Sequence, residues 1–224
     1  MELTPIAAWL NSVFAGFDTA IAQFAFSLHE GPLGGFFDFF FPNVTHLGDK
    51  GLFLIVVGVI LLLFARTRKG GASMLIALLF GLLMTNLFLK HLVERPRPYV
   101  DEFGIFREFW QVIGHGLEKE AGSFPSGHAT SVFAAMTAVF WAFDKKYSWT
   151  AFLFAGIIGF SRVYIHVHYA SDILGGMLVG LLVGSAAFFL VRWLYNKIAA
   201  SNSPAARLIT TSDIRNLYKK REVS

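Results

Sequence analysis

The sequence predicts an all-α, polytopic membrane helix bundle with five or six membrane helices. Hydrophobic residues make up 55% of the 224 positions and charged residues only 15%, whereas ordinary soluble domains have roughly 45–50% and about 25%. Several apolar segments approach the roughly 20 residues that a membrane helix needs, and no polar linker divides them. We therefore expect one membrane-embedded domain over residues 1–198, followed by a basic tail over residues 199–224.

Five apolar segments are expected to form membrane helices. The first, residues 51–65, is short for a hydrocarbon core of about 30 Å at about 1.5 Å per residue. We therefore expect Arg66, which follows it, to snorkel toward the interface. The other four segments cover approximately residues 73–93, 126–143, 149–166 and 170–195.

The N-terminal region leaves a sixth membrane helix open. Residues 8–28 are long enough to span a membrane but carry Asn11, Asp18 and Gln23. Because a charge at bilayer depth costs at least about 2.5 kcal/mol, we favour an amphipathic helix lying at the interface over a spanning helix. Residues 31–50, which are rich in phenylalanine, are expected to form an aromatic interfacial loop with a helical turn.

The distribution of charge predicts the orientation of the bundle. Basic residues follow the first, third and fifth segments, so these ends and the C-terminal tail are expected in the cytoplasm. Residues 90–125 and 161–172 then lie on the opposite side of the membrane. The net charge of +4 follows this distribution, and no basic stripe with interleaved aromatic residues indicates nucleic-acid binding. The chain has no cysteine, which excludes disulfides and thiolate chemistry.

Three clusters of polar residues lie on the expected outer side. The first is KHLVERPRP, residues 90–98, where two prolines bias Arg95 and Arg97 away from helical geometry. Lys90 supplies a compact charge and Arg97 a planar fork of donors that suits phosphate oxygens. The structural alternative is that these cations are snorkelling anchors, with Glu94 paired to Lys90 one helical turn away.

The second cluster is GSFPSGHATSVF. Ser123 is a candidate N-cap and Pro125 a first-turn residue, so a helix is expected to begin at Ser126-Gly127-His128. The first turn of a helix has N–H groups without internal partners and the positive end of the dipole, so it can bind phosphate. Gly127 would allow close approach of an anion, and His128 can exchange a proton. Ordinary capping beside a surface histidine is the alternative.

The third cluster is SRVYIHVHYASD, residues 161–172. His168 and Asp172 are four residues apart and share a helix face, so the carboxylate can hold the Nδ1 proton and leave Nε2 free as a nucleophile. Arg162 ends the preceding helix and can reach the same place. A metal site formed by His166, His168 and Asp172 is disfavoured, because helical residues two apart do not share a face. The three clusters together supply what metal-free phosphoryl transfer needs: cations for the phosphate oxygens, a nucleophile and an acid.

The three clusters resemble the signature of the type 2 phosphatidic acid phosphatase (PAP2) superfamily, which also includes the vanadium haloperoxidases. Lys90 to Pro98 fits K-x6-R-P, residues 125–128 fit P-S-G-H, and Ser161 to Asp172 fits S-R-x5-H-x3-D. The motif region spans residues 90–172, and the surrounding apolar helices also fit. The resemblance implies a PAP2/haloperoxidase-like helical core and a phosphatase that needs no metal or other cofactor.

The resemblance also implies a role for each motif residue. His168 would be the nucleophile that forms a phosphohistidine, and Asp172 would orient it. His128 would protonate the leaving group and then activate water. The phosphate would be held by Lys90, Arg97, Ser126, Gly127 and Arg162.

Bacterial membrane members of this family hydrolyse phosphatidate, phosphatidylglycerol phosphate or undecaprenyl diphosphate outside the cytoplasmic membrane. We expect a lipid phosphatase of the cell membrane with undecaprenyl diphosphate as the favoured substrate and the other two lipids close behind. A non-catalytic lipid-phosphate binder or transporter on the same scaffold is the alternative; the oligomeric state is left open. The chain departs from the family in lacking a clear first apolar span and in carrying His166 where glycine is frequent, and we expect His166 to pack or anchor.

Overall fold

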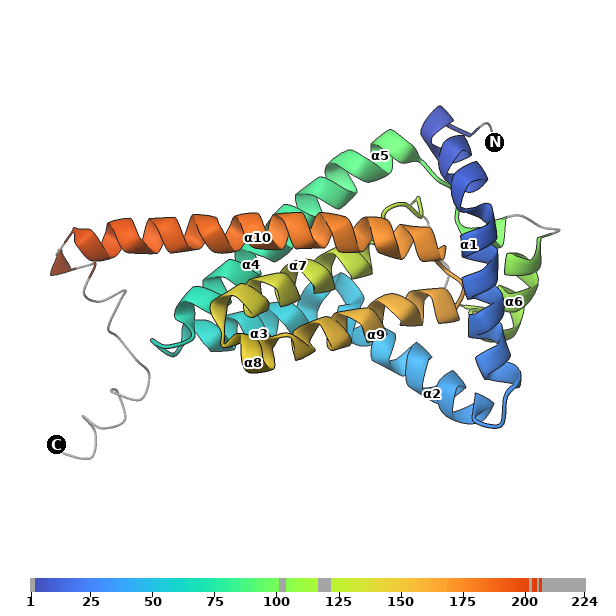
Figure 1. Cartoon of the computed structure of the whole chain (residues 1–224), viewed down its shortest axis with the longest axis horizontal. Helices are drawn as coiled ribbons and strands as arrows, with labels where there is room; N and C mark the ends of the chain where they lie inside the picture. The colour runs from blue at the N-terminus through green and yellow to red at the C-terminus, as the bar shows by residue number, and fades with distance from the viewer. Residues whose placement is uncertain (1–2, 101–103, 117–121, 202, 205, 207–224) are drawn as a thin grey trace.

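The fold is built entirely of helices in the part of the chain that the structure describes (Figure 1). The computed structural model describes residues 3–100, 104–116, 122–201, 203–204 and 206. Its longer helices are α1 (Pro5–Glu30), α2 (Gly34–Val44), α3 (Leu52–Leu62), α4 (Arg68–Leu82), α6 (Ile105–Ile113), α7 (Gly127–Ala142), α9 (Thr150–Tyr164) and α10 (Ala170–Ala200). Shorter helical segments are η1 (Thr45–Gly51), η2 (Leu83–Leu89), α5 (Lys90–Val93), η3 (Pro98–Val100) and α8 (Lys145–Ser148).

The five apolar segments fall on helices. They correspond to α3, to α4 with its continuation through η2 and α5, and to α7, α9 and α10. Three helical stretches among the described residues are long and apolar enough to cross a membrane: Gly34–Leu62, Arg68–Val100 and Ala170–Ala200. Helices α7 and α9 have 16 and 15 residues, fewer than the roughly 20 that a bilayer core requires. The all-helical fold is thus confirmed, and the count of five or six membrane helices stays a prediction.

The expectation of a loop over residues 31–50 is wrong. These residues form α2 and η1, and η1 leads directly into α3. Phe41 of α2 belongs to a core, because its ring centroid lies 4.6 Å from that of Tyr164 and 5.2 Å from that of Phe160. Aromatic side chains contribute strongly to cores, and aromatic residues also gather in belts at the membrane interface. The sequence pattern of consecutive aromatic residues did not distinguish the two environments.

Helix α1 runs across the end of the bundle instead of along it (Figure 1). It is not among the three stretches that could cross a membrane by length and composition. One side of α1 is buried on the bundle through Ala7, Leu10, Ala22 and Ala25, and Asp18 is buried with them. This arrangement fits the expected interfacial helix, although its buried face carries a carboxylate.

Helices α4, α7 and α10 form the centre of the bundle, and small residues bring them together. A Cβ atom added to Gly180 of α10 would lie 2.6 Å from Cβ of Phe133 and 2.8 Å from the backbone nitrogen of Ala134, both on α7. Glycine therefore permits the close approach of α10 to α7, as small residues do at helix contacts in membrane proteins.

The two ends of the bundle differ in chemistry. The turn between α3 and α4, the short helix α8 and the C-terminal end of α10 lie at one end, and the start of α7 and the connection from α9 to α10 lie at the other (Figure 1). The ammonium of Lys69 lies 4.6 Å from the ring centroid of Tyr195, which places the start of α4 beside the last turns of α10. The basic ends thus lie together and opposite to the three polar clusters. The predicted tail, residues 199–224, lies mostly outside the described residues.

Candidate active site

The three polar clusters converge around His168. This side chain lies in the connection between α9 and α10 and is only 4% exposed. Burial lowers the pKa of His168 well below its ordinary value, and the positive charges of Arg97, Arg162 and Lys90 lower it further, together with His128. Residues that are far apart in the sequence therefore act on one imidazole, which is held in its neutral form.

The hydrogen bonds of His168 identify its tautomer. Nδ1 lies 3.2 Å from Oδ2 of Asp172, and Nε2 lies 3.3 Å from Nη1 of Arg97. Arginine can only donate, so Nε2 accepts and Nδ1 carries the proton that Asp172 accepts. We infer this assignment from the partners, since hydrogen positions follow from the network. The lone pair of Nε2 therefore points toward the cations, as the sequence predicts for a nucleophile.

Two buried arginines lie close enough to His168 for their charges to act on it, and Arg97 contacts its Nε2. Nη1 of Arg97 also donates to the carbonyl of Val167 at 2.8 Å. Nη1 of Arg162 donates to Oγ1 of Thr45 at 2.8 Å, but Nε and Nη2 of Arg162 are buried without a hydrogen-bond partner among the described residues. Buried donors are almost always satisfied, so these two nitrogens indicate a place for an acceptor that binds from outside.

Helix α7 presents its N-terminus to the same region. The cap is Ser126, whose side chain accepts from the backbone nitrogen of Ala129 at 3.4 Å. The prediction that Ser123 caps this helix is wrong. The backbone N–H of Ser123 donates to the carbonyl of Arg95, and its hydroxyl donates to the carbonyl of Pro96. These bonds hold the preceding loop against the first motif and leave Ser126 to cap the helix.

Gly127 leaves space in front of the first turn of α7. A Cβ atom added there would have only Oδ1 of Asn86, at 3.9 Å, near it. Packing therefore does not demand glycine at this position. Open space in front of a helix N-terminus is what an anion that binds there requires.

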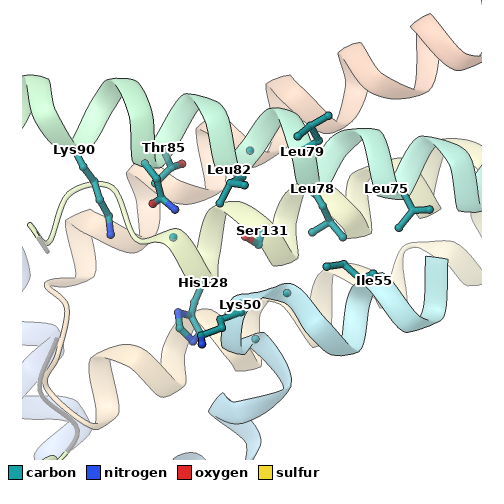
Figure 2. Close-up of a pocket in the computed structure, with 15 residues that line it drawn as sticks. Lys50, Ile55, Leu75, Leu78, Leu79, Leu82, Thr85, Lys90, His128 and Ser131 are labelled. Carbon is teal, nitrogen blue, oxygen red and sulfur yellow. The ribbon is translucent and has the colours of Figure 1, made fainter. Parts of the chain in front are cut away.

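A cavity of about 560 Å³ reaches Gly127 and His128 from the side of the bundle (Figure 2). Its inner end is polar and includes Lys90 of α5, while leucines of α4 and Ile55 of α3 line the rest. The size suits a ligand of several hundred daltons. Lys90 points into this cavity, and no ion pair between Lys90 and Glu94 occurs among the described residues, so the snorkelling alternative for Lys90 is not supported. His168 does not line the cavity and lies deeper in the protein.

His128 is held by a carboxylate that the sequence did not reveal. Nε2 of His128 lies 2.8 Å from Oδ1 of Asp49, and Oδ2 of Asp49 lies 2.7 Å from Nδ1 of His46. Asp49 sits at a kink of η1, where Lys50 has a φ of 51°. The contact between Asp49 and His128 could not be predicted from a loop over residues 31–50. It depends on the kinked turn in η1, and no helix periodicity indicates it.

His166 faces away from this site. It is buried, and its ring centroid lies 5.2 Å from that of Phe109 and 6.4 Å from that of Phe26. Burial lowers its pKa to about 3. The expected packing role fits this position, and the disfavoured metal set of His166, His168 and Asp172 is not brought together. The φ of His166 is 52°, a region that favours glycine.

Arg95 is the main site residue that the sequence did not reveal. It is 1% exposed, and its Nη1 lies 2.8 Å from Oδ1 of Asp172. Its Nη2 lies 2.9 Å from Oδ2 of Asp18 in α1. The signal that could have found this pair was the charge of Asp18 in an apolar segment, because an ionisable residue at membrane depth normally has a buried partner.

Comparison with known proteins identifies the family. Residues 70–198, more than half of the chain, match the PAP2 superfamily. Phosphatidylglycerophosphatase B of Bacillus subtilis (strain 168) is 31% identical over 170 residues, which cover 70% of this chain and 74% of that protein. Undecaprenyl-diphosphatase BcrC of the same strain is 29% identical over 106 residues, 47% of this chain and 50% of that protein.

Comparison with solved structures identifies the same family. The crystal structure of a transmembrane PAP2 type phosphatidylglycerolphosphate phosphatase from Bacillus subtilis superposes with a TM-score of 0.60 at 29% identity, covering 86% of this chain and 92% of that chain. The matched residues include all three polar clusters around His168. The chain belongs to the PAP2 superfamily and is a membrane lipid phosphate phosphatase of that family.

Proposed function

We propose that the chain hydrolyses its lipid phosphate through a phosphohistidine at His168. Nε2 of His168 attacks phosphorus, the bond to the leaving oxygen breaks, and His128 gives that oxygen a proton. His128 then takes a proton from water, whose oxygen attacks phosphorus and releases inorganic phosphate and the free Nε2. Asp172 holds the Nδ1 proton throughout both steps, as in other nucleophile–orienter pairs.

The phosphate is held, without a metal, by donors from helices α5, α7 and α9 and from the loop that follows α5. Lys90, Arg97 and Arg162 neutralise the phosphate oxygens, while Ser126 and Gly127 offer the first turn of α7. The hydroxyl hydrogen of Ser126 is not used by the capping bond, which Ser126 accepts. Such donors stabilise the charge that develops on the equatorial oxygens, which is the main task in phosphoryl transfer.

One observation carries this proposal: in the described part of the chain, Nε and Nη2 of Arg162 are buried without a hydrogen-bond partner, and the charge of Arg162 acts on His168. A buried, unsatisfied guanidinium is costly to keep. A phosphoryl group placed between Arg162 and His168 would satisfy both nitrogens and stand within reach of the nucleophile. An apolar or cationic substrate would leave the cost unrelieved.

The cavity favours an amphiphilic substrate. Its polar end at Lys90, Gly127 and His128 would take the phosphate head, and its leucine-lined part would take the start of an acyl or prenyl tail (Figure 2). We propose undecaprenyl diphosphate as the favoured substrate, with phosphatidylglycerol phosphate and phosphatidate close behind. Relatives named for the first two activities support both.

We further propose that the site faces the extracytoplasmic side of the cell membrane. The basic turn before α4, Lys145 and Lys146 lie at the opposite end of the bundle (Figure 1), and basic ends normally stay in the cytoplasm. In this orientation α1 lies at the outer interface, five helical segments cross the membrane, and the basic tail is cytoplasmic.

The non-catalytic alternative, a lipid-phosphate binder or transporter, is not favoured. Binding alone would need the cations but neither the Nδ1-protonated His168 nor the carboxylates that hold His168 and His128. Haloperoxidase chemistry is disfavoured because the chain is embedded in the membrane. Vanadate should instead inhibit the phosphatase, because it mimics phosphate.

The test is phosphate release from the three lipids in detergent, measured side by side with excess chelator. We expect turnover of all three, with the highest kcat/KM for undecaprenyl diphosphate. Chelator-sensitive activity would overturn the metal-free mechanism, and full activity of His168→Ala would overturn the nucleophile. Binding of the lipids without turnover by the wild-type protein would favour the binder.

A further inference from the structure

Arg95 has a bonding pattern unlike that of the other arginines of the site. All three guanidinium nitrogens have side-chain acceptors. Nε donates to Oδ1 of Asn11 at 2.8 Å, and Nη2 donates to Oδ2 of Asp18 at 2.9 Å. Nη1 donates to Oδ1 of Asp172 at 2.8 Å and to Oγ of Ser171 at 2.7 Å. Its carbon CZ also lies 3.9 Å from the ring centroid of Tyr169. Each guanidinium nitrogen of Arg95 is therefore already bound within the protein, in contrast to Nε and Nη2 of Arg162.

Asp18 completes the arrangement from the N-terminal helix. Its Oδ1 accepts from the backbone nitrogen of Ser171 at 2.7 Å, and its Oδ2 accepts from the hydroxyl of Ser171 at 2.8 Å as well as from Arg95. Ser171 is the second residue of α10, so Asp18 satisfies one of the N–H groups that the start of a helix leaves unpaired. The first turn of α10, which carries Asp172, is thereby fixed from α1.

The two oxygens of Asp172 have separate partners. Oδ1 accepts from Arg95, whereas Oδ2 accepts from His168 Nδ1 and from the backbone nitrogen of Tyr169 at 2.9 Å. Because Oδ1 is bonded to Arg95, the carboxylate of Asp172 cannot rotate about its Cβ–Cγ bond without breaking a charge-assisted hydrogen bond. The orientation of His168 therefore depends on Arg95, which in turn depends on Asp18.

We propose that Arg95 and Asp18 are positioning residues of the hydrolysis: they hold Asp172, and through it the imidazole of His168, in the attacking orientation. The proposal rests on the proposed roles of His168 and Asp172. It makes α1 part of the catalytic apparatus instead of a membrane anchor alone. The order of action runs from Asp18 through Arg95 and Asp172 to Nδ1 of His168, and none of the first three touches the substrate.

The decisive variant is Asp18→Asn, which keeps the shape of the side chain and removes its charge. Loss of a charge-assisted bond at this point should lower kcat about 10- to 100-fold. KM and the inhibition constant of inorganic phosphate should change less than about twofold, because the phosphate-binding cations are untouched. A second variant, Arg95→Ala, should lose more activity and regain part of it when guanidinium is added, while Arg95→Lys should not restore the bond to both carboxylates.

Asp38→Asn is the matched control. Asp38 also ties α1 to the bundle, since it accepts from Tyr164 at 2.6 Å and lies 2.9 Å from Nδ1 of His29 in α1, but it makes no contact with Asp172 among the described residues. The control should lower stability and leave kcat within about twofold. All variants are compared with the wild-type protein by thermal unfolding in the same detergent.

Each outcome decides one point. A folded Asp18→Asn protein with unchanged kcat overturns the proposal, and an equal loss of kcat in Asp38→Asn shows that anchoring of α1 is the cause. Loss of phosphate affinity in step with kcat would also contradict a positioning role. If Asp18→Asn does not fold, recovery of Arg95→Ala by guanidinium decides instead, and its absence overturns the proposal. Absence of turnover by the wild-type protein would refute the proposed function and, with it, this assignment, whereas turnover by the wild-type protein with unchanged kcat in Asp18→Asn would refute this assignment alone.

Discussion

Replacement of Arg162 by methionine should separate activity from stability. Methionine has a similar length but no charge and no donor, so it removes the two buried nitrogens that have no hydrogen-bond partner among the residues that the structure describes. Each unsatisfied buried donor costs about 1–3 kcal/mol. The substitution also removes the 2.8 Å bond to Thr45, worth about 1 kcal/mol. We therefore expect the free energy of unfolding to rise by about 1–5 kcal/mol.

The same substitution should greatly reduce catalysis. Two charge-assisted hydrogen bonds to the phosphoryl group, at about 1.5–3 kcal/mol each, amount to about 3–6 kcal/mol of transition-state stabilisation. At 1.36 kcal/mol per factor of ten, kcat/KM should fall by about 10²–10⁴. The assay is phosphate release from detergent-solubilised lipid, paired with thermal unfolding of the same preparation.

Arg95→Met is the control for this prediction. Its guanidinium is fully paired, so its removal leaves Asp18 and Asp172 as buried carboxylates without their cation. Breaking a buried pair in this way costs about 3–5 kcal/mol, so this variant should lose stability as well as activity. A loss of stability in Arg162→Met similar to that in Arg95→Met would refute the reasoning that Arg162 is kept for a ligand.

Three further predictions concern His168, Asp49 and the helix contact at Gly180. The pKa of His168 is lowered well below its ordinary value of about 6.5, so its imidazole should stay neutral as the pH falls from 8 to 6. The ring ¹⁵N chemical shifts should then stay those of a neutral imidazole, and imidazolium shifts at pH 6 would contradict this. Asp49→Asn should lower kcat about tenfold by weakening the bond to His128, whereas His46→Ala, which removes only the other partner of Asp49, should stay within about twofold; equal effects would exclude a specific role. Gly180→Ala should lower the free energy of unfolding by about 1–3 kcal/mol, because the added Cβ would lie 2.8 Å from the backbone of α7; an unchanged melting temperature would show that α10 can move away.

The sequence predicted the parts of the fold that rest on local pattern. Apolar runs located α7, α9 and α10 to within a few residues, because burial in lipid or in a bundle core needs uninterrupted hydrophobic residues. The same reasoning failed for α2, where Phe41 packs on Tyr164, because a run of phenylalanines looks the same in a core and at an interface. It also missed α6, an amphipathic helix in which only Trp110 is buried.

The site was predictable where a motif names its residues and not where distant segments meet. His168 and Asp172 are four residues apart, so helix geometry alone predicts their contact. Asp18 and Arg95 are 77 positions apart, and no local pattern indicates that Arg95 bonds carboxylates while Arg97 reaches His168. The contact of Asp49 with His128 depends on a kink with Lys50 at positive φ, which composition does not reveal.

Trapping of the covalent intermediate tests the central claim most directly. Wild-type protein and His128→Ala are mixed with a lipid phosphate, quenched within milliseconds in alkali, and analysed by mass spectrometry of peptides. We predict a phosphoryl group on His168 that survives alkali and is lost in acid. In His128→Ala this group should accumulate when the substrate has a good leaving group, because the residue that activates water is missing. A protein that turns over substrate with no phosphoryl group on His168, or with the group on another residue, would contradict the account.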